Sequence, residues 1–314
     1  MLEQKADGGT GQSFTEGTDD ATGYENKFGH GKEKTGEYWG GGGLPPALAV
    51  VYLSGAVYTS PTTNFEFRMK KIAIVMAAGK GTRMKSDLPK VLFPVRGRPM
   101  VEYVLDALEA AGIDQTILIV GYRSDLVRGT LAHRKNLRFT EQARQLGTGH
   151  AVMCCREELR AHDGPVMVVA GDCPMIQVDS IRALFDGYAV SPQPSCVLGT
   201  ANKENPIGLG RIVRNAAGEF LRIIEEKDAD EEQKRITEVN MSYYVFHTPD
   251  LLLALNELKT DNSQGEYYIT DIPAVLKSQN KRVVALSVLH PIESLGVNTV
   301  DELVVVERAM QGPF

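Results

Sequence analysis

Glycines and cationic side chains lie close together in one short segment, residues 77–90. Gly79 and Gly81 follow an apolar run that we expect to be a strand, and Arg83 and Lys90 come a few positions later. Because glycine has no Cβ, the backbone N–H groups of such a loop can approach a phosphate closely. Arginine and lysine then neutralise the charge of a triphosphate. The segment predicts a binding loop for a nucleoside triphosphate; for the two glycines alone, an ordinary strand-to-helix loop is the alternative.

The spacing of this loop excludes two common phosphate-binding patterns. A Walker A loop, G-x-x-x-x-G-K-[ST], fails because no glycine stands five residues before the Gly79-Lys80 pair. The dinucleotide pattern G-x-G-x-x-G fails because Gly81 is followed by Thr, Arg and Met. The remaining pattern, Gly-x-Gly-Thr-Arg-Met with Pro89-Lys90 shortly after it, resembles the signature of sugar-phosphate nucleotidyltransferases.

A second loop, which begins at Gln142, combines an amide side chain with glycines. The amide offers both a donor and an acceptor, so it can read the N3–H and carbonyl edge of a pyrimidine. Gly147 and Gly149 would let the main chain approach the flat base. As the alternative, Thr148 caps a helix that starts here. His150, on the first turn of that helix, is expected to be packed or hydrogen-bonded rather than to bind a ligand.

Carboxylates and amides that suit a metal and a sugar occur further along the chain. Asp172 comes directly after a buried apolar run. One Asp together with phosphate oxygens is a sufficient Mg²⁺ site, although a strand-end Asp is also a common turn or cap residue. Gly210, Glu225 and Asn240 supply a glycine approach, a carboxylate and an amide, groups that recognise sugar hydroxyls. Taken singly, each of these three is more typical of a surface hairpin.

The composition is that of an ordinary globular chain. The 314 residues are 43% hydrophobic and 24% charged. A net charge of −6 gives no electrostatic support for a nucleic-acid partner. The four cysteines show no metal-ligand spacing, so we expect reduced thiols in a cytoplasmic protein. An apolar stretch at residues 44–59 is shorter than the ~20 residues of a bilayer span, and no membrane partner is expected.

The chain changes character near Met69. Residues 1–43 hold 12 of the 31 glycines and few aliphatic side chains, a composition typical of disorder. Met69 and two lysines directly precede the first expected strand of the remaining chain. We therefore expect residues 1–68 to be a low-complexity, disordered extension that is either lineage-specific or the product of a mis-called start.

From residue 69 onward, short apolar runs alternate with helical periods. The expected strands are residues 72–76, 115–120, 137–140, 166–170 and 195–200, and the expected helices are residues 100–111, 124–131, 149–160 and 180–188. This alternation predicts an α/β fold, a Rossmann-like and mostly parallel sheet with helices on both faces. Ligands of such sheets collect at the carboxyl ends of the strands, where the Gly79 loop and Asp172 both fall.

The alternation is lost between about residues 211 and 246. There we expect hairpins and a short acidic helix, Ala229–Lys234, which together form a small β-rich subdomain on the sugar side. Residues 299–314 are expected to form a C-terminal helix that opens with two acids, a charge that suits a helix N-terminus.

Seven short segments occur in a fixed order along the chain: AAGKGTRM, SDLPKVL, QLGTGHA, GD-x-P, EEKDA, GEYYITDI and GVN. Together they resemble the bacterial N-acetylglucosamine-1-phosphate uridylyltransferases, the pyrophosphorylase half of a bifunctional enzyme. The resemblance runs from Met69 to about Met310. It implies a nucleotidyltransferase domain over residues 69–298, of the nucleotide-diphospho-sugar transferase type. No hexapeptide repeats of the acetyltransferase β-helix domain occur in the chain.

The resemblance also implies roles for individual residues. Ala77, Ala78 and Gly79 would approach the uridine, and Gln142, Gly147 and Thr148 would select uracil. Arg83 and Lys90 would be the catalytic residues that hold the phosphates. Asp172 and Asn298 would ligate the catalytic Mg²⁺, and Gly210, Glu225 and Asn240 would contact the amino sugar.

The implied reaction joins UTP and N-acetylglucosamine 1-phosphate to give UDP-N-acetylglucosamine and pyrophosphate. A sugar-phosphate oxygen, already anionic, would attack the α-phosphorus without a general base. Positioning and charge neutralisation would then supply the catalysis. A separate acetyltransferase would have to supply the substrate.

Two departures from the family pattern keep alternatives open. Ala170 stands where an aromatic residue is usual, and Met241-Ser242 stand where Thr-Gly is usual. Both fall at the sugar pocket by resemblance, so another acceptor, such as glucose 1-phosphate or an N-acetylgalactosamine epimer, is one alternative. A cytidylyl or thymidylyl transferase is disfavoured by QLGTGHA and GEYYITD. A catalytically inactive, nucleotide-sensing subunit is the third, and the joint presence of the residues expected to bind phosphate and metal argues against it.

Overall fold

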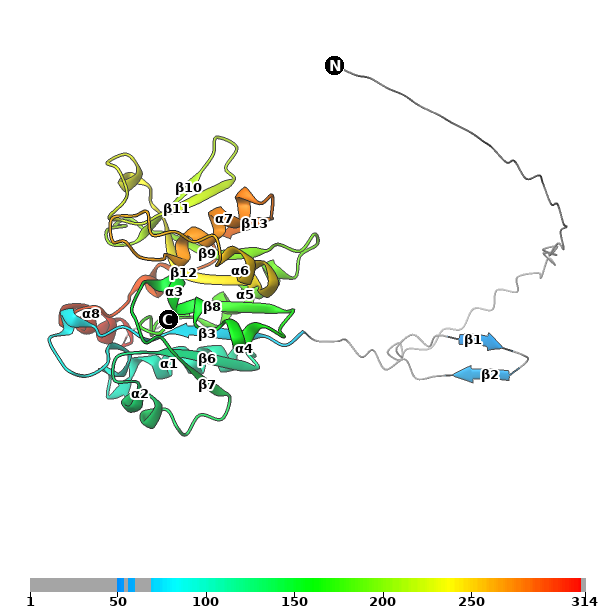
Figure 1. Cartoon of the computed structure of the whole chain (residues 1–314), viewed down its shortest axis with the longest axis horizontal. Helices are drawn as coiled ribbons and strands as arrows, with labels where there is room; N and C mark the ends of the chain where they lie inside the picture. Colours follow the sequence, from blue (N-terminus) through cyan, green and yellow to red (C-terminus); the bar gives the residue numbers. More distant parts are fainter. Residues whose placement is uncertain (1–49, 54–55, 60–68, 312–314) are drawn as a thin grey trace, which may run out of the picture. The chain divides into compact units, whose positions relative to one another are not determined.

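The computed structural model of the chain describes residues 50–53, 56–59 and 69–311 (Figure 1). These residues belong to two compact units, one that ends at Phe65 and one that begins at Glu66. In the first unit, β1 (Val50–Leu53) and β2 (Ala56–Thr59) pair as an antiparallel hairpin. No strand was expected in this part of the predicted low-complexity extension. The rest of the expected low-complexity extension lies outside the described residues.

The second unit is built on a nine-stranded mixed sheet. Its first half consists of four parallel strands in the order β8-β3-β6-β7, and β12 then continues the sheet antiparallel to β8. β9 pairs along the far edge of β12, while β10 pairs with Val239 and Asn240 on the edge that β8 uses further along the strand. The strands are β3 (Ile72–Met76), β6 (Gln115–Val120), β7 (Leu137–Glu141), β8 (Pro165–Ala170), β9 (Cys196–Asn202), β10 (Gly210–Arg214), β11 (Phe220–Ile224), β12 (Glu238–His247) and β13 (Val283–Leu286).

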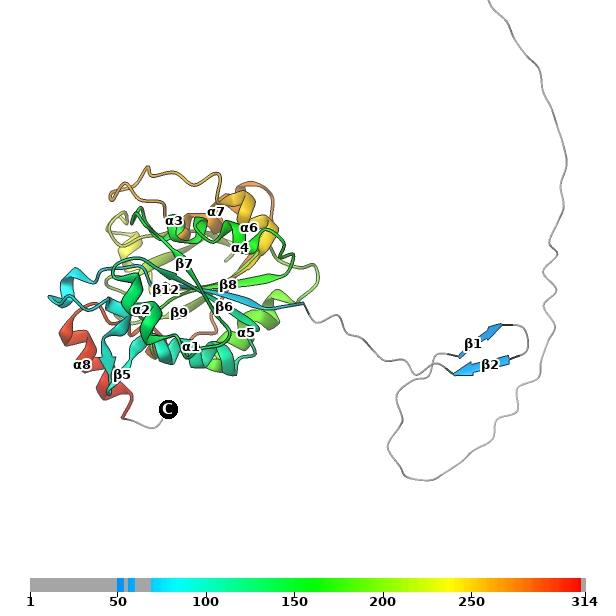
Figure 2. The ribbon, with the colours of Figure 1, turned by 60° about the horizontal axis from the view of Figure 1, so that its bottom comes forward.

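Helices cover both faces of this sheet, as Figure 2 shows. The alternation of side chains along β3 explains why: Ala73 and Val75 pack into one core with α1 and α5, while Ile72 and Ile74 pack into a second core with α3, α6 and α7. The helices are α1 (Met100–Ala110), α2 (Ser124–Thr130), α3 (Thr148–Met153), α4 (Arg156–Leu159), α5 (Val178–Tyr188), α6 (Thr248–Ala254), α7 (Ile272–Ser278) and α8 (Val300–Ala309). The expected α/β fold with a mostly parallel sheet is confirmed.

One expected helix is divided in two. Instead of a single helix over residues 149–160, α3 and α4 are separated at Cys154-Cys155. There the backbone N–H of Cys155 donates to Val152 O, three residues back, which tightens the last turn of α3. Cys155 itself leaves the helical region, with φ −89° and ψ 7°, and α4 starts after it.

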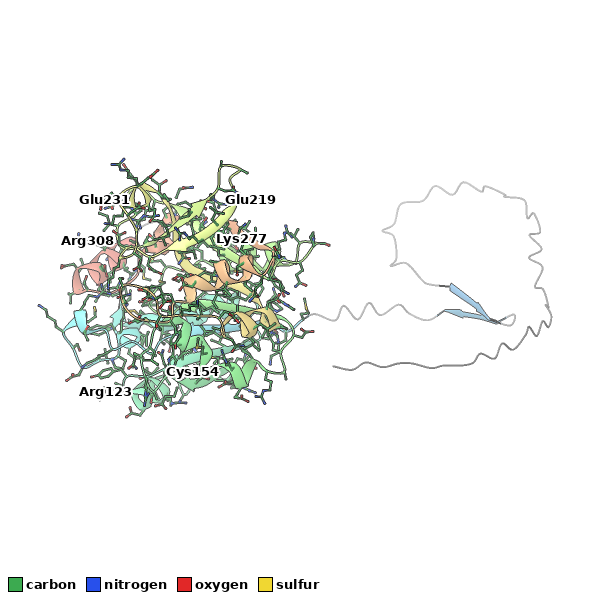
Figure 3. The ribbon with its side chains drawn as sticks, turned by 45° about the horizontal axis from the view of Figure 1, so that its top comes forward. Arg123, Cys154, Glu219, Glu231, Lys277 and Arg308 are labelled. Carbon is green, nitrogen blue, oxygen red and sulfur yellow. The ribbon has the colours of Figure 1, made fainter. Side chains whose placement is uncertain are left out.

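The β-rich subdomain consists of the β10–β11 hairpin and the loop that follows it. The expected helix Ala229–Lys234 is wrong: only a 3₁₀ turn, η3 (Gln233–Arg235), forms. Asp230 Oδ1 accepts from the backbone N–H groups of Glu232 and Gln233, so the side chain stabilises a turn in place of a helix. Glu219 and Glu231 lie at the outer edge of this subdomain (Figure 3).

The parallel strands bring two predicted site segments together. In the β3–β8 pair Met76 lies opposite Ala170, so the glycine loop and Asp172 leave the sheet at neighbouring positions. The backbone N–H of Gly171 donates to Met76 O at 3.0 Å, which holds the ends of the two strands side by side. Across the described part of the chain, no helix has the length and apolar character needed to cross a membrane.

Candidate functional site

The glycine loop after β3 packs directly against the segment that carries Lys90. Gly81 has φ +67°, and a Cβ at this position would lie 2.7 Å from Lys90 Cβ. Any other residue would therefore be strained and would also push Lys90 away. Arg83 and Lys90 lie in two 3₁₀ turns that follow the loop, η1 (Thr82–Met84) and η2 (Lys90–Leu92).

Four predicted site residues meet beside this loop. Lys90 forms an ion pair with Asp172, and its Nζ also donates to Asn298 Oδ1 at 2.6 Å. Arg83 donates to the same Asn298 oxygen at 3.0 Å. The structure thus brings together the two residues predicted to hold phosphates and the two predicted to ligate a metal.

The donor set at this cluster fits Mg²⁺. A carboxylate of Asp172 and the amide oxygen of Asn298 converge on one positive charge, the ammonium of Lys90, so a cation is held where the two oxygens meet. Mg²⁺ prefers such hard oxygen ligands and takes its remaining ligands from phosphates and water. Among the described residues no group of three or more His, Cys, Asp or Glu side chains is placed to hold a metal. Two protein oxygens completed by a substrate are therefore the fitting arrangement.

Asn298 is held in place by the helix that follows it. Glu302 accepts from the backbone N–H groups of Asn298 and Thr299 at 2.5 and 3.1 Å. Thr299 Oγ1 in turn accepts from the backbone N–H of Glu302, which completes a capping box at the start of α8. Asn298 therefore precedes the N-cap rather than serving as the cap, and its side chain is available to the site.

A cavity of about 300 Å³ lies beside the glycine loop. It is lined by the residues predicted to bind the nucleotide: Ala77, Ala78, Gly79, Gln142, Gly147 and Thr148. The Gln142 side chain is 3% exposed, and its Nε2 donates to Gly147 O at 3.0 Å and lies 3.1 Å from His150 Nδ1. Because both amide hydrogens of Gln142 are directed at protein acceptors, its side-chain carbonyl oxygen can accept a hydrogen bond from a ligand.

A segment more than 100 positions later supports this loop. Tyr267 N–H donates to Leu146 O, Gly149 N–H donates to Tyr267 O at 2.7 Å, and Ile269 N–H donates to Thr148 Oγ1 at 3.0 Å. Gly147 has φ +108°, and a Cβ on it would lie 2.5 Å from Tyr267 O. The QLGTGHA and GEYYITD segments are thus two halves of one structure.

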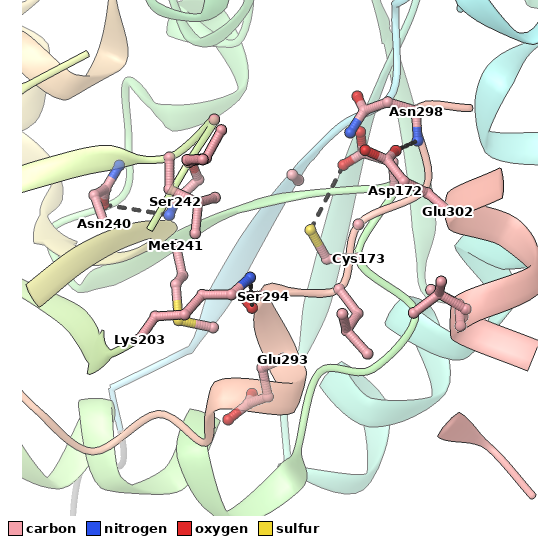
Figure 4. A pocket seen from close by; sticks show the side chains of 18 of the residues that line it. Asp172, Cys173, Lys203, Asn240, Met241, Ser242, Glu293, Ser294, Asn298 and Glu302 are labelled. Atoms are coloured by element: carbon pink, nitrogen blue, oxygen red, sulfur yellow. Dashed lines mark hydrogen bonds between the residues drawn. The ribbon is translucent and has the colours of Figure 1, made fainter. Parts of the chain in front are cut away.

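A second cavity, of about 510 Å³ (Figure 4), shares part of its lining with the first. Ala170, Asp172 and Ser242 line both cavities, so the cation cluster lies at their junction. Asn240 lines only the larger one, and its Oδ1 accepts from Tyr244 OH at 3.0 Å and from Ser242 N–H at 3.3 Å.

The residues predicted to bind the sugar are only partly brought together. Gly210 lies opposite Asn240 in the β10–β12 pair but is buried and does not line the larger cavity, whereas Gly208 and Leu209 do. Glu225 lines a neighbouring hollow that it shares with Arg83. Burial raises the pKa of the Glu225 carboxyl above its ordinary value. Asn240 is thus the one of the three that lines the larger cavity.

Sequence reasoning missed two side chains of this larger cavity. Lys203, just after β9, donates from Nζ to Ser294 Oγ at 2.8 Å across the cavity wall. Lys203 lies in a loop and Ser294 ends a 3₁₀ turn 91 positions later, and neither belongs to a recognisable motif. Ser242, which the sequence already marked as a departure from the family pattern, also lines this cavity. Its φ is +59°, in a β-bulge of β12. The glycine that is usual there is the residue that adopts this conformation without strain.

A family model for the MobA-like NTP transferase domain matches residues 73–262, more than half of the chain. The chain belongs to the MobA-like NTP transferase family. Within it, this NTP transferase is 44% identical over 243 residues to a bifunctional protein GlmU of Streptococcus equi subsp. zooepidemicus. It is 45% identical over 230 residues to a bifunctional protein GlmU of Lactococcus lactis. These matches confirm the family resemblance read from the sequence motifs.

The matched regions cover most of this NTP transferase but only about half of each relative. They take in 77% and 73% of the chain, against 52% and 50% of the two relatives. The chain spans about half the length of the curated relatives it matches. A crystal structure of UDP-glucose pyrophosphorylase complexed with UDP-glucose shares the fold, with a TM-score of 0.60 at 18% identity over 77% of this chain and 99% of that one.

Proposed function

We propose that the chain transfers a uridylyl group from UTP to N-acetylglucosamine 1-phosphate and releases pyrophosphate. The observation that carries this proposal is the cluster of Arg83, Lys90, Asp172 and Asn298 at the junction of two cavities. A phosphoryl-transfer enzyme needs its charge-neutralising groups where the two substrates meet. The identity of 44% to a bifunctional GlmU supports the choice of substrates.

In the proposed reaction an oxygen of the sugar phosphate forms a bond to the α-phosphorus of UTP, and the bond from that phosphorus to the β-phosphate oxygen breaks. The electron pair leaves with pyrophosphate, so no proton has to be removed from the nucleophile. Lys90 and Arg83, which here donate to Asn298, would transfer their hydrogen bonds to phosphate oxygens. A Mg²⁺ ion on Asp172 and Asn298 would supply Lewis-acid stabilisation of the same charge.

Gln142 would select the base through the oxygen of its amide. The N3–H of uracil can donate a hydrogen bond to this oxygen, whereas N3 of cytosine carries a lone pair and cannot donate. The hydrogen bonds of the amide NH₂ group to Gly147 and His150 support this orientation. Ala77, Ala78, Gly79 and Thr148 would surround the uridine. Gly210, Glu225 and Asn240 remain the proposed contacts to the sugar, with Asn240 as the direct one.

Uridylyl transfer to a different sugar 1-phosphate is the second candidate. Ala170 and Ser242, the two departures at the junction of the cavities, are the observations that favour it. A cytoplasmic location and a separate acetyltransferase that supplies the substrate also remain predictions from the sequence.

Pyrophosphate release by the full chain, with Mg²⁺ and UTP and each of several sugar 1-phosphates, tests the proposal. We expect the highest kcat/KM with N-acetylglucosamine 1-phosphate. A higher value with another sugar would favour the second candidate. No release with any sugar 1-phosphate, despite measurable UTP binding, would contradict both and favour a nucleotide-sensing role.

A further inference from the structure

Lys203 is a cation of the larger cavity that no carboxylate neutralises in the described structure. Its ammonium donates to Ser294 Oγ, and Ser294 Oγ in turn donates to Pro291 O at 2.6 Å. Burial lowers the pKa of the Lys203 ammonium below its ordinary value. An ammonium has three N–H donors, so two remain for a ligand.

The carboxylates that line the same cavity are all occupied. Asp172 pairs with Lys90. Glu293 is fully buried and accepts from Ser180 Oγ and from two backbone N–H groups. Glu302 accepts from the two backbone N–H groups at the start of α8. Lys203 therefore points a positive charge and free donors into a space where the protein provides no acid for it (Figure 4).

The backbone fixes the position of this lysine. Lys203 N–H donates to Thr237 O at 2.9 Å, which ties the residue after β9 to the residue before β12. Asn240 and Met241, on β12, line the same cavity. The lysine, directly after β9, and the predicted sugar-binding amide on the neighbouring strand β12 thus line one cavity.

We infer that Lys203, together with Ser294, forms a subsite that binds a hydroxyl oxygen of the sugar and makes Lys203 a specificity-determining residue. The inference rests on the proposed function, because it assigns the larger cavity to the sugar. A ring hydroxyl can accept from the ammonium while its own hydrogen is donated elsewhere. The cations at the junction, Arg83 and Lys90, remain for the phosphates.

Calorimetric titration of the full chain with UDP-N-acetylglucosamine and with UDP tests this subsite, because the difference between the two affinities isolates the sugar. Lys203→Met is expected to weaken UDP-N-acetylglucosamine binding about tenfold and to leave UDP binding within about twofold, the effect of one charge-assisted hydrogen bond. Lys203→Arg should recover part of the loss. Lys259→Met, at an exposed lysine, is the matched control and should change neither affinity.

Three results would overturn the subsite. The first is that wild type and Lys203→Met bind the sugar nucleotide with equal affinity. The second is that Lys203→Met loses the same affinity for both ligands, which would place Lys203 on the phosphates. The third is that wild type binds the sugar nucleotide no more tightly than UDP. If wild type bound a UDP-hexuronic acid more tightly than UDP-N-acetylglucosamine, and Lys203→Met lost more affinity for it, the group that Lys203 binds would be a carboxylate and not a hydroxyl.

Steady-state kinetics separate this inference from the proposed function. In Lys203→Met the KM for the sugar 1-phosphate is expected to rise about tenfold, with the KM for UTP unchanged. Absence of wild-type turnover with every sugar 1-phosphate would contradict the proposed function, whatever the affinities of the Lys203 variants. Normal wild-type turnover with an unaltered sugar KM in Lys203→Met would contradict the subsite alone.

Discussion

Lys90 and Asn298 lie 208 positions apart in the chain, yet Lys90 Nζ donates to Asn298 Oδ1 at 2.6 Å. The same ammonium pairs with Asp172, and the same amide oxygen accepts from Arg83. The glycine loop, the end of β8 and the residue before the α8 cap therefore share one polar cluster. In the proposed reaction these four side chains exchange their internal hydrogen bonds for phosphates and a cation.

Replacement of the carboxylate in this cluster should abolish most catalysis. Asp172→Ala is expected to lose on the order of several kcal/mol of transition-state stabilisation. The loss is measured as the fall in Mg²⁺-dependent turnover. The side chain is 23% exposed and contributes little to the core, so the fold should persist, as circular dichroism would show. Asp186→Ala, at an exposed acid of α5, should retain full activity. Wild-type rates in Asp172→Ala would remove Asp172 from the metal site.

Base selection should depend on the oxygen of the Gln142 side chain. Gln142→Ala removes the acceptor proposed for the N3–H of uracil, so the ratio of kcat/KM for UTP and CTP is expected to fall by about tenfold or more. Steady-state assays with the two nucleotides measure this ratio. Gln279→Ala, at an exposed glutamine after α7, should leave the ratio unchanged. Equal discrimination by Gln142→Ala and wild type would mean that another group reads the base.

The bulge in β12 should carry measurable strain. Ser242 has φ +59°, a conformation that costs a non-glycine residue about 1–2 kcal/mol. Ser242→Gly is therefore expected to raise the free energy of unfolding by about 1 kcal/mol, less the entropy that glycine adds to the unfolded chain. Asn280→Gly, at another left-handed position, should gain less because Asn tolerates this region better. Urea denaturation compares the variants, and a loss of stability in Ser242→Gly would contradict strain at this site.

The ion pair between Arg214 and Glu238 should make stability depend on acid pH. Burial alone would raise the pKa of the Glu238 carboxyl, but hydrogen bonds from Arg214 and Thr200 outweigh it and lower the pKa below its ordinary value. Because the folded state holds the proton less tightly than the unfolded state, this stabilisation is present above the unfolded pKa of about 4.3. It is lost as the pH falls through the lowered folded-state pKa.

Glu238→Gln tests this dependence. The variant is expected to be about 1–2 kcal/mol less stable than wild type at pH 7, because the two hydrogen bonds from Arg214 lose the charge of their acceptor. The two stability curves should approach each other as the pH falls below about 4. Urea denaturation at a series of pH values gives the curves. A difference that stays constant down to pH 3 would show that the charge of Glu238 contributes nothing.

The sequence predicted the parts of the fold that depend on local pattern. The apolar runs that became β3 and β8 could be read directly, and parallel pairing then placed the glycine loop beside Asp172. Motif order identified Asn298, whose position depends on a capping box with Glu302.

The missed features depend on contacts between distant segments. Lys203 and Ser294 meet only because the loops after β9 and before α8 converge, and no local pattern encodes that distance. The break at Cys155 and the turn at Asp230 replace predicted helix because local hydrogen bonds compete with it. Glu225 was grouped with Asn240, although the structure places it in a hollow beside Arg83.

The fate of the α-phosphate tests uridylyl transfer most directly. The full chain would be incubated with Mg²⁺, N-acetylglucosamine 1-phosphate and UTP labelled at its α-phosphate, and the labelled product would be identified by mass. We expect UDP-N-acetylglucosamine that carries the label, together with one unlabelled pyrophosphate for each product molecule. Label that remains in UTP, or that appears as UMP, would contradict it.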